Sequence, residues 1–371
     1  MKRIFLLCFT AISLVGLSQE NASPYKFKLV KSLESTEAKD QCKTGTCWSF
    51  ATTSFLESEL IRMGKGKHDL SEMFNVRVTY PKKAWFYVRA MGKTQFGPGS
   101  LGHDVINTLK SDGLVPESAY PGLQGGSGKH NHDELDALLE AMVKSLAERQ
   151  GLSEQWDDAL GAVLDAYLGA YPKEFEYEGK RYTPASFRDA MGLKADDYVN
   201  LSSFSHVPFY ENFILEVPDN FSRGSFVNLP LDELVLTVKN AIEKGYSVNW
   251  DADVSEKGFS FKDGVAIYPS LDLPKAELFE QMVDEPAVDQ VMRQKGYDSH
   301  ATTDDHLMHI TGIANDQNGK LYFIIKNSWG VGNEMQGFQY VSESYFRMKT
   351  IAVTLHKDGI SPDIIKKIAR K

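Results

Sequence analysis

The chain has 371 residues, of which 42% are hydrophobic and 25% are charged. This is the composition of a globular protein with enough apolar material for a large core, and it argues against a disordered chain. Acidic residues number 50 and basic residues 41, so the formal net charge is −9. Because the basic residues form no block beyond the short segment KKIARK, nucleic-acid binding is not expected. The expected partners are peptides or other proteins.

The first 18 residues have the pattern of a secretory signal peptide. Lys2 and Arg3 precede the apolar run IFLLCFTAISLVGL, and a polar Gln-Glu pair follows it. The run is too short for a spanning helix, and no later stretch is long and apolar enough to cross a bilayer. Cys8 lies within the run without the small residues that precede a lipidated cysteine. The sequence therefore predicts export to the periplasm or the extracellular space, with no stable membrane anchor.

Residues 19–128 are predicted to form an N-terminal arm with the strand-like segment KFKLV, followed by a helical lobe. Within them, the stretch QCKTGTCWSFATTSFLESEL reads as a turn-rich loop that runs into an amphipathic helix. Its apolar residues recur at roughly helical spacing, and no Gly or Pro follows Cys47 until Gly64. We therefore expect Cys47 to lie at the start of a helix that ends near Gly64.

Further helices, and then strands, follow along the chain. Asp69 or Ser71 is placed to cap a second helix, and Gly113 to end a third. Residues 129–225 are predicted to be a mainly helical insertion, in which the sequence shows no chemistry. Residues 226–371 begin with a helix and then change to the strand-like segments YSVNWDADV, GVAIYP, HLMHITGI, LYFIIKN, GFQYVS and TIAVTLH. The expected fold class is therefore α+β, with a helical lobe joined to a β-rich lobe.

The stretch around Cys47 suits a thiol nucleophile. At a helix start, unpaired amide N–H groups favour a thiolate over a thiol. Gln41, six residues earlier, can offer its side-chain amide to an oxyanion, with the Cys47 N–H as the second donor. Export leaves Cys42 as the other cysteine, and a Cys42–Cys47 bridge would close a very short loop and consume the nucleophile. Both are therefore predicted to be free thiols, with Cys42 a small buried residue.

A hairpin in the β-rich lobe offers a base for this nucleophile. The segment TDDHLMHITGIANDQNGKLYFIIKNSWG carries His306 and His309 on one arm and Asn327 at the end of the other. An imidazole can take the thiol proton, and a side-chain amide can fix the tautomer of that imidazole. Trp329, two residues beyond Asn327, can cover this hydrogen bond and keep water away from it.

Together these residues resemble papain-like cysteine peptidases. The shared motifs are Q-x-x-x-x-x-C-W-S-F, an Asp-His pair with glycine six residues later, K-N-S-W-G, LSE after the first helix, and a Gly-Ser pair before the third. The long middle insertion, GLVP and the tail SESYFRMKTIAVTLHKDGI are more similar to the bleomycin hydrolase and aminopeptidase C branch. The resemblance covers most of residues 38–128 and 230–365. It implies a papain-like two-lobe fold, in which a helical lobe faces a β-barrel-like lobe.

The resemblance also implies a role for each matching residue, and neither a cofactor nor a metal is among the implied components. The implied site comprises Gln41 for the oxyanion hole, Cys47 as nucleophile, His306 as base, Asn327 as the residue that orients the base, and Gly99, Ser100 and Trp329 for substrate binding. For the Gly-Ser pair, a loop that needs small residues is the alternative interpretation.

Two registers of the hairpin leave two assignments of the base. A tight Asn-Gly turn would place His309 opposite Ser328, close to Asn327, and would move His306 away. A loop centred near residues 316–317 would instead bring His306 to Asn327. The spacing to the following glycine and the preceding aspartate favour His306 by the resemblance. His309 is then expected on the opposite face of the strand, in a structural or supporting role.

The predicted function is that of an exported cysteine peptidase that hydrolyses peptide bonds through a thioester, with aminopeptidase action as the first choice. In the resembled branch a C-terminal arm enters the cleft, and its terminal carboxylate holds the substrate amine. Here the chain stops at IIKKIARK, a basic segment that attracts an ammonium group poorly, although the α-carboxylate of Lys371 is available. An endopeptidase with an open cleft is one alternative. A catalytically idle papain-like protein for binding or assembly is another, and the branch also suggests a homo-oligomer.

Two other pairs of residues carry weaker signals. His130 and His132 could bind a metal, but no second ligand cluster accompanies them and a solvated loop is favoured. Asp251 and Asp253 follow a strand and could pair with a substrate amine, although a solvated strand end is favoured. The sequence therefore predicts no metal site.

Overall fold

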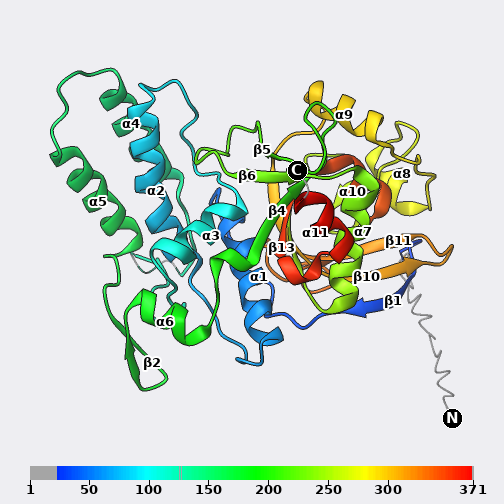
Figure 1. Ribbon diagram of the computed structural model, residues 1–371, viewed down its shortest axis with the longest axis horizontal. Coiled ribbons are helices and arrows are strands. Elements are labelled where there is room, and N and C mark those ends of the chain that lie inside the picture. The colour runs from blue at the N-terminus through cyan, green and yellow to red at the C-terminus, as the bar shows by residue number, and fades with distance from the viewer. Residues whose placement is uncertain (1–22, 125, 127, 370–371) are drawn as a thin grey trace, which may run out of the picture.

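The protein is a mixed α+β molecule. The computed structural model describes residues 23–124, 126 and 128–369, so the predicted signal peptide, residues 1–18, lies outside the described residues. The helices are α1 (Cys47–Arg62), α2 (Glu72–Arg89), α3 (Gly102–Ser111), α4 (Asp133–Ala147), α5 (Gln155–Leu168), α6 (Pro184–Met191), α7 (Leu231–Lys244), α8 (Lys275–Glu280), α9 (Gln290–Asp298), α10 (Glu343–Lys349) and α11 (Pro362–Ala369), with short 3₁₀ turns η1 (Ala195–Asp197) and η2 (Lys357–Gly359) (Figure 1). The strands are β1 (Phe27–Ser32), β2 (Phe175–Tyr177), β3 (Lys180–Tyr182), β4 (Tyr198–Ser202), β5 (Asn212–Ile214), β6 (Ser225–Asn228), β7 (Val248–Ala252), β8 (Phe259–Ser260), β9 (Val265–Ala266), β10 (His306–Asp316), β11 (Leu321–Lys326), β12 (Phe338–Ser342) and β13 (Thr350–His356).

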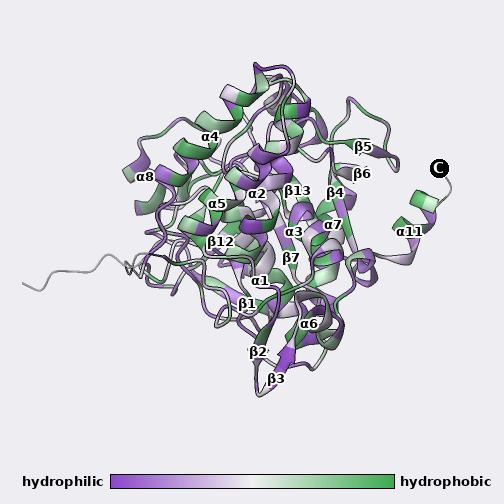
Figure 2. Ribbon diagram, turned by 90° about the vertical axis from the view of Figure 1, so that its left-hand side faces the viewer, coloured by the Kyte–Doolittle hydropathy of each residue, from purple (hydrophilic) through white to green (hydrophobic). Residues whose placement is uncertain are grey.

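The helical lobe is built from α2, α4 and α5, which lie together on the left of Figure 1. The Ser71 hydroxyl caps α2 by accepting a hydrogen bond from the Phe74 N–H at 3.0 Å, so the predicted cap is confirmed for Ser71. Along α4, hydrophobic and hydrophilic residues alternate (Figure 2), and Leu135, Leu139 and Val143 form its buried face. These side chains join the helical core, as expected for an amphipathic helix. In the described part of the chain, no helix is long and apolar enough to cross a membrane.

Helix α1 lies between the two lobes, and this changes the expectation for it. Every residue from Cys47 to Leu60 is buried, so the helix is not amphipathic as predicted. Its apolar residues enter the helical core, whereas polar residues face the sheet. The Asn249 side chain on β7 donates to the Thr52 hydroxyl at 3.0 Å, and the Ser54 hydroxyl lies 2.9 Å from His309 Nδ1. The polar residues of α1 therefore bond to the sheet rather than to water, because both lobes cover the helix.

The β-rich lobe is organised by one large sheet. Within the described residues, eleven strands form it, in the order β5-β6-β4-β13-β7-β10-β11-β12-β9-β8, with β1 paired to β10. Most neighbours are antiparallel, and β12–β9 and β4–β6 are parallel. Trp250, Phe323 and Phe346 are among the fully buried side chains of a second core between this sheet and helices α7 and α10. The predicted strands are confirmed, and the two lobes have separate cores.

The segment 129–225 contributes to both lobes. Its helices α4 and α5 pack on α2 and share the helical core, whereas β4 pairs with β13 and so extends the large sheet. A loop between β5 and β6 then returns toward the helical lobe, where Phe221 contacts Phe86. Its helices α4, α5 and α6 are accompanied by the strands β2, β3, β4 and β5, which were not expected because they are short.

The hairpin of β10 and β11 has a register that matches neither alternative drawn from the sequence. Asn315 pairs with Leu321, and the Asp316 N–H donates to the Lys320 carbonyl at 2.9 Å, so residues 317–319 form the turn. Asp316 Oδ1 also accepts from the N–H groups of Asn318 and Lys320 at 2.8 Å each. A β-bulge between Ile310 and Gly312 then shifts the pairing. Because a bulge inserts one residue, counting outward from the turn fails beyond this point. His309 consequently pairs with Lys326 rather than with Ser328.

Candidate active site

Cys47 is the first residue of α1 and lies against β10. Its side chain is buried, and the backbone of Leu307 forms a hydrogen bond with the sulfur. Burial raises the pKa of this thiol to about 12, and the carboxylates of Asp304, Asp219 and Asp251 act in the same direction. Burial and nearby negative charge therefore oppose the stabilisation of a thiolate that was expected from the helix start. The proton must leave the thiol as a substrate binds or reacts.

Gln41 is tied to the opposite lobe through Ser328. Its backbone N–H donates to the Ser328 carbonyl at 2.8 Å, and its Oε1 accepts from the Ser328 hydroxyl at 2.6 Å. Its Nε2 donates to the Thr44 carbonyl at 2.8 Å, which leaves the second amide hydrogen for another acceptor. Beside it, the Gly330 N–H donates to the Lys39 carbonyl at 3.0 Å. This short antiparallel pairing holds the loop before α1 in place.

His306 and Asn327 form a hydrogen-bonded pair. The distance from His306 Nε2 to Asn327 Oδ1 is 2.9 Å, and because an amide oxygen only accepts, Nε2 carries the hydrogen and Nδ1 the lone pair. Asn327 is itself fixed, since its Nδ2 donates to Gln339 Oε1 at 2.8 Å. The Trp329 ring stacks on the imidazole with centroids 4.7 Å apart. Burial lowers the pKa of His306 and the bond to Asn327 opposes that shift, which favours a neutral imidazole.

His309 lies apart from this pair. It is completely buried, and its Nδ1 is 2.9 Å from the Ser54 hydroxyl on α1. Its ring meets Phe55 edge-on at 6.1 Å, and burial holds its pKa well below the usual value. The structure therefore brings His306, not His309, to Asn327. His309 contacts the body of α1, as expected for a residue on the other face of the strand.

Gly99 and Ser100 lie in the loop before α3, which is attached to α1. The Trp48 indole N–H donates to the Pro98 carbonyl at 3.0 Å. The Gly99 carbonyl accepts from the Lys83 ammonium, and a Cβ built on Gly99 would collide with the Asp219 carboxylate. The Ser100 side chain is buried and donates to Asp104 Oδ2 at 2.6 Å. Glycine is thus required by close approach, and the serine hydroxyl holds the start of α3.

Comparison with known proteins identifies the family of this chain. The model of the Peptidase C1-like family matches residues 102–371, which is most of the chain. The chain belongs to the Peptidase C1-like family. The matched part contains His306 and Asn327, whereas Cys47 precedes it. This membership places the protein among the papain-like cysteine peptidases.

The relatives point to the aminopeptidase C branch of this family. Aminopeptidase G of Lactobacillus delbrueckii subsp. lactis is 24% identical over 373 residues, which span 89% of this chain and 83% of that protein. Aminopeptidase C of Lactobacillus helveticus is 22% identical over 379 residues, which span 90% of this chain and 82% of that protein. PepW from Lactobacillus rhamnosis shares the fold, with a TM-score of 0.72 at 19% identity, over 92% of this chain and 85% of that chain.

In this Peptidase C1-like chain, several residues next to the site were missed from the sequence. Asp219 comes from the segment in which no chemistry was expected, and Lys83 comes from the middle of α2. Gln339 on β12 is fully buried and holds Asn327. Asp251 and Asp253 are each 4% exposed, so the prediction of a solvated strand end is wrong. The surrounding sequence offered no signal for Lys83, Asp219 or Gln339, because they reach the site only through the packing of distant segments. Asp251 and Asp253, by contrast, were named from the sequence as able to pair with a substrate amine.

The remaining predicted residues lie outside this group. Both described cysteines are free thiols, as expected, but Cys42 is half-buried rather than buried. His132 is buried at 3% exposure, so the solvated loop predicted for it is wrong, and burial lowers its pKa to about 4. His130 lies beside it, with ring centroids 6.0 Å apart. Within the described residues, no group of three or more His, Cys, Asp or Glu side chains is arranged to hold a metal ion.

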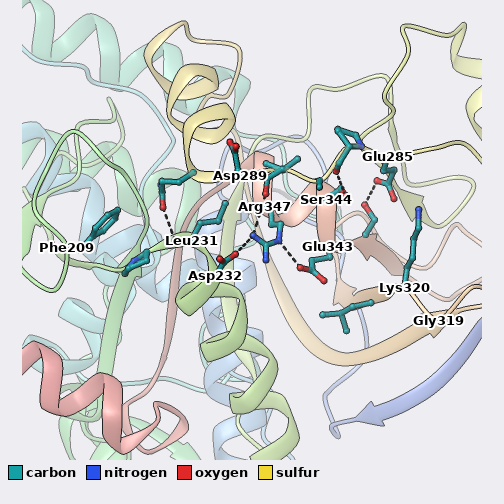
Figure 3. Close-up of a pocket in the computed structure, with 17 residues that line it drawn as sticks. Phe209, Leu231, Asp232, Glu285, Asp289, Gly319, Lys320, Glu343, Ser344 and Arg347 are labelled. Atoms are coloured by element: carbon teal, nitrogen blue, oxygen red, sulfur yellow. Dashed lines mark hydrogen bonds and ion pairs between the residues drawn. The ribbon is translucent and has the colours of Figure 1, made fainter.

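A pocket of about 830 Å³ lies elsewhere, between α7, α10 and the loop that precedes α9 (Figure 3). Its lining includes none of the seven candidate site residues. The Arg347 guanidinium in this pocket is already paired with Asp232 and Glu343, each at 2.7 Å. The charge of Arg347 is therefore compensated within the fold, and we do not assign peptide hydrolysis to this pocket.

Proposed function

We propose that this chain is an exported cysteine aminopeptidase, with Cys47 as nucleophile, His306 as base, Asn327 as the residue that orients the base, and Gln41 in the oxyanion hole. The observation that carries the proposal is the 2.9 Å hydrogen bond between His306 and Asn327, directly beside the strand residue whose backbone meets the Cys47 sulfur. The family supports a cysteine peptidase, and the names of the relatives support aminopeptidase action.

The mechanism follows from which atoms are free. Asn327 occupies Nε2 of His306, so Nδ1 accepts the proton of the Cys47 thiol as the sulfur attacks the substrate carbonyl. The oxyanion receives hydrogen bonds from the remaining Gln41 amide hydrogen and from the Cys47 N–H. His306 then protonates the leaving amine, and an acyl thioester is left on the sulfur. Water attacks that thioester with His306 as base, which releases the carboxylic acid and restores the thiol.

Because burial favours the neutral forms of both Cys47 and His306, the pair is expected to transfer its proton during attack rather than beforehand. A thiol with a pKa near 12 is a weak nucleophile without a base in place. Activity should therefore depend strongly on His306. Trp329 stacks on the imidazole and limits the access of water to its bond with Asn327.

The test of this proposal uses Cys47→Ala and a thiol-directed epoxide. The variant should lose hydrolysis of a peptide with a free amino terminus while keeping its thermal unfolding transition, because the change is small. The epoxide should label Cys47 in the unmodified protein, whereas the half-buried Cys42 serves as the internal control. Peptide turnover near the original rate in Cys47→Ala would refute the nucleophile assignment.

The alternatives differ in their substrates. An endopeptidase would cleave an amino-terminally blocked peptide as well as a free one, and an idle binding protein would cleave neither. Four polar residues with complementary roles favour an active enzyme, since an idle site has no need of them together.

Export and assembly are also proposals. The signal-peptide pattern of residues 1–18 supports export, and deleting those residues should retain the protein in the cytoplasm. A homo-oligomer is suggested by the branch, and light scattering on the purified protein would test it.

A further inference from the structure

Three carboxylates from separate segments converge beside Cys47. Asp219 comes from the loop between β5 and β6, Asp251 from β7, and Asp304 from the loop that enters β10. All three act on the Cys47 thiol and raise its pKa, so their charges lie close to the sulfur. Asp251 also pairs across the strands with Leu307, whose backbone meets the same sulfur. Three carboxyl groups from separate segments therefore surround the nucleophile.

Among the three carboxylates, Asp251 gives the strongest indication of a binding site. Its side chain is 4% exposed, and among the described residues no N–H or hydroxyl group donates a hydrogen bond to either of its oxygens. The Asp304 carboxyl is its polar neighbour, and Asp304 Oδ2 likewise receives no hydrogen bond there. A buried carboxylate without donors is costly, and one shared proton is the way such a pair relieves that cost. Apart from the proton that it shares with Asp304, Asp251 has no donor among the described residues, so a cationic donor can take the place of that proton.

The positive charges near these three carboxylates do not compensate their negative charge. Lys83 acts on Asp219 and on Asp304, but its ammonium donates to the Gly99 carbonyl and burial lowers its pKa. Lys83 therefore acts on two of the three carboxylates, and it also interacts with Asp104 and Asp136. Burial raises the pKa of Asp304 to about 7, so a proton is retained on the pair near neutral pH. A second ammonium group brought by a ligand would replace that proton and satisfy the unpartnered oxygens.

A metal ion is a poorer candidate than an ammonium group for this position. Among the described residues, these carboxylates do not meet the arrangement that three or more ligands of a metal ion require. An ammonium carries three donors on one nitrogen and can be shared by carboxylates that do not converge on a single point. Asp219 also occupies the space beside Gly99, where a Cβ would collide with it. A peptide that continued past this point would meet a carboxylate rather than open space.

We infer that Asp219, Asp251 and Asp304 bind the α-ammonium group of a peptide substrate and so limit cleavage to its amino-terminal end. This inference rests on the proposed function, because it concerns what enters the same site. In a peptide, the α-nitrogen of the first residue lies two bonds, or about 2.5 Å, from the carbonyl carbon that Cys47 would attack. Asp251 pairs across the strands with Leu307, whose backbone meets the Cys47 sulfur, and this places its carboxyl group beside the position of that nitrogen. The side chains of the body of the protein, rather than its tail, supply this anchor.

The described part of the tail lies elsewhere. In α11, Ile364 enters the sheet-side core, and the Lys367 ammonium pairs with Glu233 on α7. Lys367 also lies over the Tyr210 ring at 5.2 Å. The test therefore needs no variant without the tail, because it changes the three carboxylates directly.

The experiment compares a free and an amino-terminally acetylated form of one aminoacyl coumarin amide, on the full chain and on three variants. Asp219→Asn, Asp251→Asn and Asp304→Asn keep side-chain size and remove the charge. Each should lower kcat/KM for the free substrate by about 10- to 100-fold, the loss of one charge-assisted hydrogen bond, and leave the acetylated substrate unchanged or improved. Asp272→Asn is the matched control, since Asp272 is 85% exposed and pairs with Lys257 at the surface.

The outcomes separate the two claims. If the unmodified protein cleaves both substrates equally, or if the ratio of their kcat/KM values is unchanged in every folded variant, the inference is wrong while the peptidase proposal stands. If neither substrate is cleaved and the epoxide fails to label Cys47, the proposed function fails and the inference falls with it. If Asp251→Asn does not fold, two other measurements decide whether the carboxylates bind the α-ammonium group. One uses Asp219→Asn, whose residue lies on a half-buried loop, and the other uses a substrate that has a hydroxyl group in place of the α-amine. That substrate should react as poorly as the acetylated one.

Discussion

Replacing Asn327 by Ala tests how the base is oriented. The change removes the 2.9 Å hydrogen bond to His306 Nε2 and leaves Gln339 Oε1 without its donor at 2.8 Å. During attack the imidazole becomes charged, and a hydrogen bond to a charged group contributes about 1.5–3 kcal/mol. At about 1.4 kcal/mol per tenfold, kcat should fall by about 10- to 150-fold. KM should change little, because Asn327 is buried at 2% exposure behind His306.

The assay is the pH dependence of kcat with an aminoacyl coumarin amide. The bond from Asn327 raises the pKa of His306, so the variant should have a lower pKa there, and the acid limb of the profile should move to lower pH. Asn228→Ala is the control, since Asn228 is fully buried and its side-chain bonds go to the backbone of residues 204–208. It should lose stability without a shift of the acid limb. An Asn327→Ala enzyme with kcat within twofold of the original and an unmoved limb would refute the reasoning.

Three further predictions concern single side chains. Gln41→Ala should lower kcat by about 100- to 1,000-fold, the usual effect of losing one oxyanion donor, and single-turnover kinetics that show no loss in acylation would contradict it. His306→Ala should abolish turnover. His309→Ala should keep turnover but lower the melting temperature, because it removes the partner of the Ser54 hydroxyl and creates a cavity. The reverse result would assign the base to His309. Glu285→Gln should flatten the decline of the free energy of unfolding with rising pH. Burial raises the pKa of Glu285 from 4.5 to about 7. The contribution of the protonated Glu285 to stability is therefore complete below pH 4.5 and is lost as pH rises through 7. Melting temperatures from pH 4.5 to 7.5 with the same slope in both proteins would contradict this assignment.

The charge around Cys47 links substrate binding to activation of the thiol. Asp304, Asp219 and Asp251 raise the pKa of Cys47 together with burial. A bound ammonium group would cancel part of that negative field, so the thiol would lose its proton more easily when a substrate with a free amine is present. The rate of alkylation of Cys47 at fixed pH should therefore rise in the presence of an amino acid amide and not of its acetylated form.

Local sequence determined the position of the proposed nucleophile and much of the framework. The run after Cys47 has no helix breaker, so it forms α1 from that residue, and Ser71 caps α2 because its hydroxyl is placed to accept from the first turn. Alternating and continuous apolar segments in the last third form β7 and β10–β13. These features depend on neighbours a few residues away, and the resemblance to papain-like peptidases indicated their expected partners in the other lobe.

Only the tertiary structure decided which side chains meet. The bulge in β10 sets the register that separates His306 from His309, and no pattern in the hairpin sequence reveals it. Burial of α1 on every side, and with it the raised pKa of Cys47, results from packing between two lobes. Asp219 reaches Gly99 from a loop more than a hundred residues away. Contacts of such separation depend on the assembled cores, and local periodicity carries no information about them.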